Sequence, residues 1–176
     1  GLPLHRFVYA SSSSVYGDHV AIPMRENALP QPVSPYGVTK LAAEQLCYLY
    51  HVNHGVPTSS LRYFTVYGPR QRPDMGFHRF ITAAIAGDPI HLYGDGEQTR
   101  DFCFVQDVVE ANLLAAETTN TEAIGSVFNI AGGTRTSVNE LLEIMRQVTG
   151  KSIPADYQEM RVGDIGLASR LGVDAL

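Results

Sequence analysis

Short apolar runs with the spacing of a β-strand alternate along this chain with longer runs that have the spacing of an α-helix. A buried strand is predicted at 6–10, and apolar side chains recur at helical spacing over 36–54. A second strand is predicted at 58–64, and further helices at 77–86 and 106–117. Strands that alternate with helices in this way favour an α/β protein with a mostly parallel sheet.

The remaining segments fit the same alternation. Residues 11–17 are expected to form a loop of small residues, and the proline-rich stretch 18–35 a surface loop. Ser137 and Glu140 form a capping-box pattern that predicts the start of another helix. Further short strands are predicted at 91–93, 100–105, 127–131 and 151–157.

The composition argues against several classes of function. The chain is 44% hydrophobic and 18% charged, as in globular proteins, and its net charge of −5 comes with no basic stripe for nucleic acid. No apolar run reaches the ~18 residues of a membrane span, and no signal peptide is evident, so a cytoplasmic location is expected. Cys47 and Cys103 are expected to be reduced thiols. The His residues are scattered; His51 and His54 are expected on a solvated face, and no metal site is predicted.

The strongest local feature is the sequence Tyr36-Gly-Val-Thr-Lys40 at the start of a predicted helix. Residues i and i+4 project from the same face of a helix, so the Tyr36 hydroxyl and the Lys40 ammonium can point to one place. A fixed ammonium would stabilise a nearby phenolate and so make the tyrosine useful as a base. By itself this spacing is weak, because an exposed helix start with a salt-bridging lysine has the same pattern.

A run of serines gives that motif its context. Ser11 to Ser14 follow directly on the first buried strand, and Val15-Tyr-Gly17 closes the run. In open α/β sheets, ligands bind at the carboxyl ends of the strands. A flexible serine loop is disfavoured by the apolar strand on one side and the apolar closure on the other.

Four motifs occur in order: ASSSSVYG, YGVTK, LRYFTVYGP and RDFCFVQD. In this order and spacing the chain resembles the extended short-chain dehydrogenase/reductase family over about two thirds of its length. Within it, the likeness is greatest to NAD-dependent sugar-nucleotide 4-epimerases, and Gly68-Pro-Arg-Gln-Arg-Pro-Asp-Met75 is similar to the branch that acts on UDP-glucuronate.

The resemblance implies a cofactor, NAD, and a mechanism. Tyr36 would remove the proton from the sugar C4 hydroxyl as hydride passes to NAD, and Ser12 would hydrogen-bond the C4 oxygen. Lys40 would hold the nicotinamide ribose and assist Tyr36. Together with Tyr36 and Lys40, Tyr63 is implied in cofactor binding. The 4-keto sugar would then take the hydride back on its other face.

The resemblance also implies groups for a UDP-sugar substrate. Arg100 and Arg161 match arginines that approach the nucleotide phosphates, and a guanidinium pairs bidentately with such oxyanions. For a sugar carboxylate the position favours Arg72, with Arg70 as a competitor. Hydroxyl groups are implied to assist Arg72 at Ser13, Ser14 and Thr65.

Ser13 and Ser14 distinguish between members of the family. Sugar dehydratases carry Asp and Glu at these positions, and serine cannot easily replace them as a general acid. This favours epimerisation of UDP-glucuronate to UDP-galacturonate. Two other activities stay open, UDP-glucose 4-epimerisation and UDP-glucuronate decarboxylation. A catalytically inactive nucleotide-sugar-binding module is the alternative of another class.

The chain departs from the family pattern at its start, because no Gly-rich dinucleotide-binding turn precedes the first strand. We therefore expect a single partial domain over 1–176, which either forms a homodimer or pairs with a missing N-terminal half. Within it, a Rossmann-like portion is expected at 1–66 and parts of 98–135. A small substrate-binding lobe is expected mainly at 67–97 and 136–176.

Overall fold

The computed structural model describes residues 4–18 and 21–159, which fall into two compact units. The first unit comprises Gly1–Val66 and Cys103–Gly132, and the second comprises Tyr67–Phe102 and Gly133–Leu176. The chain thus passes from the first unit to the second and back before it enters the second again.

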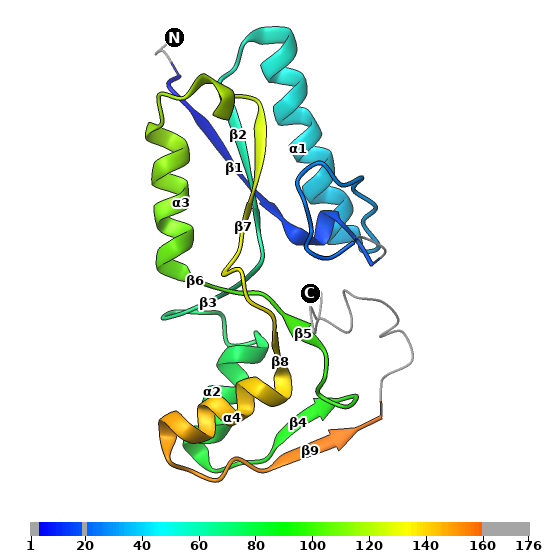
Figure 1. Cartoon of the computed structure of the whole chain (residues 1–176), viewed down its shortest axis with the longest axis vertical. Helices are drawn as coiled ribbons and strands as arrows, with labels where there is room; N and C mark the ends of the chain where they lie inside the picture. The colour runs from blue at the N-terminus through cyan, green and yellow to red at the C-terminus, as the bar shows by residue number, and fades with distance from the viewer. Residues whose placement is uncertain (1–3, 19–20, 160–176) are drawn as a thin grey trace. The chain divides into compact units, whose positions relative to one another are not determined.

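A three-stranded parallel sheet forms the centre of the first unit (Figure 1). Its strands are β1 (Phe7–Ser12), β2 (Thr58–Tyr63) and β7 (Ser126–Ile130), in the order β1-β2-β7. Helix α1 (Pro35–His54) lies on one face of the sheet and α3 (Val105–Glu117) on the other. The predicted α/β fold with a mostly parallel sheet is confirmed.

Two local features fix the position of α1. The Ser34 hydroxyl caps the helix by accepting a hydrogen bond from the Gly37 N–H at 3.0 Å, and Pro35 occupies the first turn. Further upstream, Gly17 has a φ of 70°, and a Cβ at this position would collide with the Gln31 carbonyl. The chain therefore needs glycine where the serine run turns into the loop that leads to α1.

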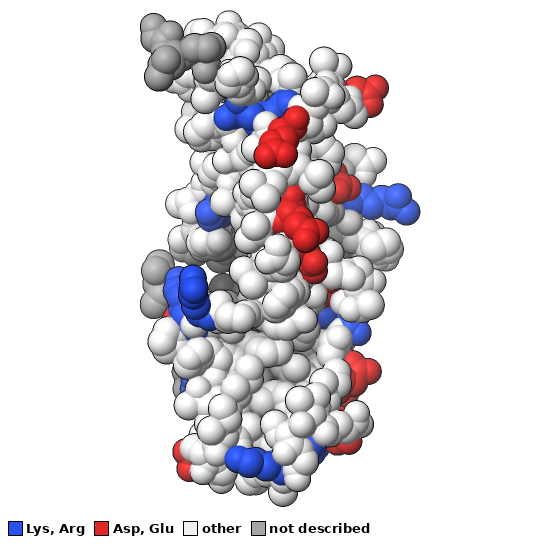
Figure 2. All heavy atoms as spheres, turned by 90° about the vertical axis from the view of Figure 1, so that its left-hand side faces the viewer, with Lys and Arg blue, Asp and Glu red and all other residues white. Residues whose placement is uncertain are grey.

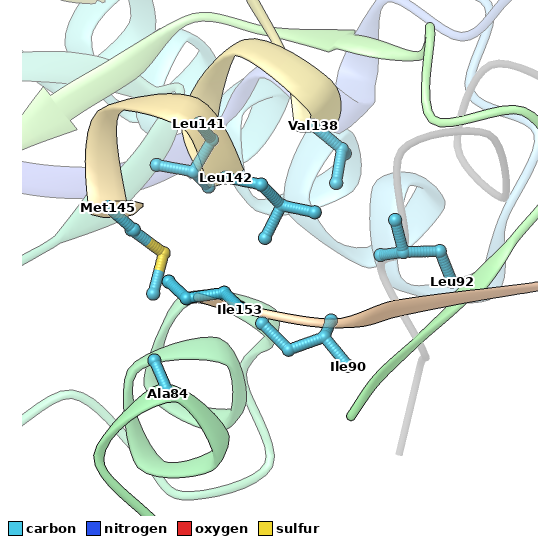
Figure 3. Packing of buried hydrophobic residues seen from close by; sticks show 8 residues of the cluster. All are labelled: Ala84, Ile90, Leu92, Val138, Leu141, Leu142, Met145 and Ile153. Atoms are coloured by element: carbon cyan, nitrogen blue, oxygen red, sulfur yellow. The ribbon is translucent and has the colours of Figure 1, made fainter. Parts of the chain in front are cut away.

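Within the second unit, the described residues form two helices and two small sheets. Strand β4 (Ile90–Tyr93) pairs in parallel with β9 (Ala155–Gln158), and β5 (Thr99–Arg100) pairs antiparallel with β8 (Thr136–Ser137). Its helices are α2 (Gly76–Ala86) and α4 (Val138–Thr149). One cluster of buried side chains holds these elements together (Figure 3): Ala84, Ile90, Leu92, Val138, Leu141, Leu142, Met145 and Ile153.

The capping box that opens α4 is confirmed. Ser137 accepts a hydrogen bond from the Glu140 N–H at 3.1 Å, and the Glu140 carboxylate accepts one from the Ser137 N–H at 2.7 Å. Both orphan donors at the start of the helix are thereby satisfied. Leu141, Leu142 and Met145, which follow the box, belong to the cluster of Figure 3.

Other element boundaries differ from the prediction. The strand predicted at 100–105 is instead two short strands, β5 and β6 (Phe102–Phe104), and Val105 already begins α3. The predicted loop 11–17 contains the end of β1 and a 3₁₀ turn, η1 (Ser13–Val15). Three short elements were not predicted: β3 (Thr65–Tyr67), which pairs with β6, then β8 and the turn η2 (Thr121–Ala123).

The described residues contain no helix with the length and apolar character that a bilayer crossing requires. Over the same residues, no cluster of three or more His, Cys, Asp or Glu side chains is arranged to hold a metal ion. On the face shown in Figure 2, Lys and Arg side chains are interspersed with Asp and Glu and form no basic stripe.

Candidate functional site

The Tyr36 and Lys40 side chains share one face at the start of α1. The Lys40 Nζ lies 5.6 Å from the centroid of the Tyr36 ring and 5.6 Å from that of Tyr9. It donates a hydrogen bond to the Ala10 carbonyl of β1 at 2.9 Å. The ammonium thus lies beside the Tyr36 ring, and a hydrogen bond holds it to the strand that ends in Ser12.

Ser12 lies at the carboxyl end of β1, and it caps η1 rather than sitting in an irregular loop. Its hydroxyl accepts a hydrogen bond from the Ser14 N–H at 3.2 Å and donates one to the Ser14 hydroxyl at 3.1 Å. Ser12 is 8% exposed, whereas Ser13 and Ser14 are half-buried. The serine run is therefore an ordered turn at the sheet edge where parallel α/β sheets bind ligands.

The start of α1 packs closely against this turn. Gly37, which follows Tyr36, is buried, and a Cβ on it would lie 2.6 Å from the Ser14 carbonyl oxygen and 2.9 Å from the Pro32 Cβ. Only glycine allows the backbone of α1 to come this near to the turn. This close approach brings Tyr36 to the same edge of the sheet as Ser12.

The donors at this edge fit a polyhydroxylated ligand such as the ribose of NAD. Lys40 has three N–H donors and uses one of them on the Ala10 carbonyl. Tyr36 is 40% exposed, so its hydroxyl is open to a ligand. Tyr63, at the end of β2, instead donates its hydroxyl to Asn112 Oδ1 of α3 at 2.8 Å, and burial raises the pKa of this phenol. The Tyr63 hydroxyl is thus neutral and already donates a hydrogen bond within the protein, so it is not free to donate to a ligand.

A buried ion pair beneath this edge was not predicted from the sequence. Glu44 of α1 and Arg62 of β2 are 2% and 3% exposed, and their side chains form a two-pronged salt bridge. Burial disfavours the charge on Arg62, but its hydrogen bonds to Glu44 and the neighbouring Tyr16 outweigh this and raise its pKa. The sequence signal was an arginine inside the otherwise uncharged strand Thr58–Tyr63, since a buried charge needs a partner.

Arg100 and Arg72 belong to the second unit. Arg100 is half-buried on β5, and burial lowers the pKa of its guanidinium to about 9. Among the described residues, no hydrogen bond or ion pair of the Arg100 side chain offsets this burial, which leaves its donors available to an anion. Arg72 forms an exposed ion pair with Asp74 at 2.7 Å. Arg161 lies outside the described residues.

The other two residues considered for the substrate occupy short structured segments. Thr65 is half-buried at the start of β3. Arg70, the competitor of Arg72, has a φ of 69°, an uncommon backbone conformation for a residue with a side chain. Ser13, Ser14 and Thr65 belong to the first unit, and the two arginines to the second.

The first unit also contains a cavity of about 410 Å³. The loop 26–30 forms one wall, and Gln45 and Tyr48 of α1 contribute to another. Glu44 and Arg62 line it, but Ser12, Tyr36 and Lys40 do not. The cavity is therefore separate from the predicted catalytic residues.

Comparison with known proteins places this arrangement in a family. Residues 2–131 match the family described as "NAD dependent epimerase/dehydratase family". An uncharacterised UDP-glucose epimerase of Bacillus subtilis is 40% identical over 161 residues, which are 92% of this chain and 50% of that protein. A UDP-glucuronate 4-epimerase of Thermodesulfobacterium geofontis is 37% identical over 162 residues, 91% of this chain and 49% of that protein.

Solved structures agree with these sequence relatives. A UDP-glucuronic acid 4-epimerase from Bacillus cereus, crystallised with UDP-glucuronic acid and NAD, has a TM-score of 0.84 and 43% identity. The match covers 90% of this chain and 50% of that one, and the chain spans about half the length of the curated relatives it matches. With the family match over most of its residues, this chain belongs to the NAD dependent epimerase/dehydratase family.

Proposed function

We propose that this chain takes part in NAD-dependent epimerisation at C4 of a UDP-sugar, with UDP-glucuronate as substrate and UDP-galacturonate as product. The observation that carries the proposal is that Tyr36 and Lys40 lie at the start of α1, where Lys40 binds the Ala10 carbonyl of β1, the strand that ends in Ser12. Relatives named UDP-glucuronate 4-epimerase, and the Bacillus cereus complex with UDP-glucuronic acid and NAD, support this choice of substrate and cofactor.

Each of these residues has a definite part in such a reaction. The Tyr36 phenol takes the proton of the C4 hydroxyl, and the Ser12 hydroxyl hydrogen-bonds the C4 oxygen. The Lys40 ammonium stabilises the phenolate of Tyr36 and donates to the ribose of NAD with the N–H groups that Ala10 leaves free. Bound NAD would supply the redox chemistry, by accepting a hydride from the sugar and giving it back.

The family resemblance extends the substrate proposal to further residues. We assign Arg100, with Arg161, to the UDP phosphates, and Arg72 to the sugar carboxylate, assisted by Ser13, Ser14 and Thr65. Tyr63 contributes its ring to the cofactor site. The first unit thus supplies the Rossmann-like portion and the second mainly the substrate-binding lobe. UDP-glucose is the second candidate substrate, because the Bacillus subtilis relative is named a UDP-glucose epimerase.

A turnover assay tests the proposal. The purified chain, and a chimera with the N-terminal part of the Bacillus cereus enzyme joined ahead of it, are incubated with NAD and either UDP-glucuronate or UDP-glucose. Chromatography then follows the C4 epimer of each sugar. We expect UDP-galacturonate from the chimera, and from the chain alone if its cofactor site is complete. A folded chimera that binds NAD but converts neither sugar contradicts the proposal.

Replacing Arg100 with glutamine is expected to weaken UDP binding by about 10- to 100-fold. A charge-assisted hydrogen bond contributes about 1.5–3 kcal/mol, and glutamine keeps most of the side chain's bulk but not its charge. Isothermal titration with UDP measures the change. Arg79→Gln is the matched control, because Arg79 is exposed on α2 of the same unit. Equal affinities for the two variants would remove Arg100 from the phosphate site.

We also propose that α1 takes part in self-association. Several large apolar side chains of this helix are exposed by 45–59%: Val38, Leu46, Leu49 and Val52. Exposed apolar surface of this kind is typical of protein interfaces. Sedimentation equilibrium is expected to give twice the monomer mass for the wild type and the monomer mass for Leu46→Glu. A monomeric wild-type chain would contradict this assignment.

A further inference from the structure

A row of three polar residues crosses the sheet of the first unit just below its carboxyl edge. The strand register aligns Ser11 of β1 with Arg62 of β2, and Arg62 with Asn129 of β7. Ser11 and Arg62 are 2% and 3% exposed. Laterally aligned residues of a parallel sheet point to the same face, and here Ser11 and Arg62 both reach α1.

Two residues of this row, Ser11 and Arg62, donate hydrogen bonds to Glu44 of α1. Its carboxylate accepts hydrogen bonds from the Ser11 hydroxyl at 2.7 Å and from Arg62 Nε at 3.0 Å, while its second oxygen accepts one from Arg62 Nη2. Both carboxylate oxygens are thus used inside the protein. Such bonds depend on direction and distance, so they fix the helix against the strands more tightly than apolar packing does.

On the helix, Glu44 lies on the same face as Tyr36 and Lys40, the proposed catalytic pair. Tyr36, Lys40 and Glu44 follow one another at i, i+4 and i+8, so they lie along one face of α1. Lys40 Nζ binds the Ala10 carbonyl, and Glu44 binds the next residue, Ser11. Two consecutive residues of β1 therefore hold two consecutive turns of the helix.

On the strand side, Arg62 holds the turn that carries Ser12. The Arg62 guanidinium lies 4.7 Å from the centroid of the Tyr16 ring, and the Tyr16 hydroxyl donates to Asn129 Oδ1 at 2.7 Å. Tyr16 is 1% exposed and ends η1, the turn that Ser12 begins. The ion pair therefore reaches the elements that carry both Tyr36 and Ser12.

We propose that Glu44 and Arg62 form a positioning pair that sets the Tyr36 hydroxyl in register with Ser12, a role that rests on the proposed function for its catalytic consequence. Neither side chain touches the reacting atoms. A displacement of a catalytic group by about 1 Å can cost about 100-fold in rate. Loss of the pair is therefore expected to affect the rate of the chemical step far more than substrate affinity.

The decisive variant replaces both partners, Glu44→Met together with Arg62→Met. Exchanging a buried ion pair for apolar residues of similar volume often leaves stability unchanged, so a merely structural pair predicts a folded and active protein. We expect instead a folded protein in which kcat falls about 100-fold while KM changes less than about threefold. Glu143→Gln, which breaks the ion pair between exposed Glu143 and Arg146 on α4, is the control and is expected to keep the wild-type kcat.

A second readout does not depend on turnover. Amide hydrogen exchange is measured on the free chain for residues 12–15 and 36–40, and both segments are expected to exchange at least about tenfold faster in the double variant. Faster exchange in both segments supports the positioning role even if the chain proves inactive, so the failure of the proposed function is told apart from the failure of this proposal. Unchanged exchange in a folded double variant overturns it.

A milder substitution covers the case in which the double variant does not fold. Arg62→Lys keeps the charge but loses the planar fork that binds Glu44 twice and stacks on Tyr16. We expect this variant to fold, to exchange faster at 12–15 and 36–40, and to lose about tenfold in kcat. Wild-type exchange and kcat in Arg62→Lys would overturn the positioning role.

Discussion

Replacing Tyr36 with phenylalanine is expected to lower the kcat for UDP-glucuronate epimerisation by about 10²–10⁴-fold, the range that a general base contributes. The substitution removes the phenol oxygen that we propose takes the C4 proton, and it leaves the ring in place beside Lys40. KM should change little, because the remaining substrate contacts are untouched. The measurement is steady-state kinetics on whichever form of the chain, alone or as the chimera, turns over.

The fall in kcat of Tyr36→Phe is not expected to come from a loss of stability. Tyr36 is 40% exposed, so removal of its hydroxyl should change the free energy of unfolding by no more than about 0.5 kcal/mol. Tyr50→Phe is the matched control, because Tyr50 is a tyrosine of the same helix, 51% exposed, and its ring packs on His54. If Tyr36→Phe and Tyr50→Phe kept equal activity, the assignment of Tyr36 as the base would be wrong.

The sequence predicted the parts of this molecule that depend on local patterns. The helix at 36–54 became α1 at Pro35–His54, because its apolar spacing, its N-cap and its terminal glycine all act within a few residues. The capping box at Ser137 is equally local. The α/β class followed from the alternation of such elements.

The short strands could not be predicted in the same way. β8 contains only Thr136–Ser137 and exists because it pairs with β5, which is distant in sequence. Two residues carry no usable period, so pairing across the fold decides their structure. The strand expected at 100–105 failed for a related reason: β5 and β6 pair with different partners, and the run is divided between them.

The candidate site also contains one part that a local pattern predicts and one part that only long-range contacts determine. Tyr36 and Lys40 could be paired from their spacing, since one helical turn brings them together. Glu44 and Arg62 are separated by a helix end and a loop, and only the packing of α1 against the sheet brings them within reach. A charged residue in a buried strand reveals that a partner exists but does not identify it.

Gly37 is the residue whose role is visible only in three dimensions, and replacing it with alanine is expected to reduce kcat by about 100-fold. Within a helix, alanine is favoured over glycine by roughly 1 kcal/mol, so the sequence alone predicts a harmless or stabilising change. The added Cβ would, however, lie 2.6 Å from the Ser14 carbonyl oxygen, a backbone atom that cannot rotate away. The start of α1 must therefore move away from η1, and Tyr36 moves with it.

The steric cost should also appear in stability. Overpacking a well-packed site costs about 1–3 kcal/mol, which exceeds the gain in helix propensity, so thermal unfolding of Gly37→Ala should begin at a lower temperature than that of the wild type. Gly76→Ala is the control, because Gly76 also lies in the first turn of a helix but has only the Phe80 Cζ, at 4.0 Å, near its Cβ position. We expect Gly76→Ala to keep both kcat and stability. A Gly37→Ala protein with wild-type values would mean that the contact between α1 and η1 yields without moving Tyr36, and that this close approach does not hold the catalytic tyrosine in place.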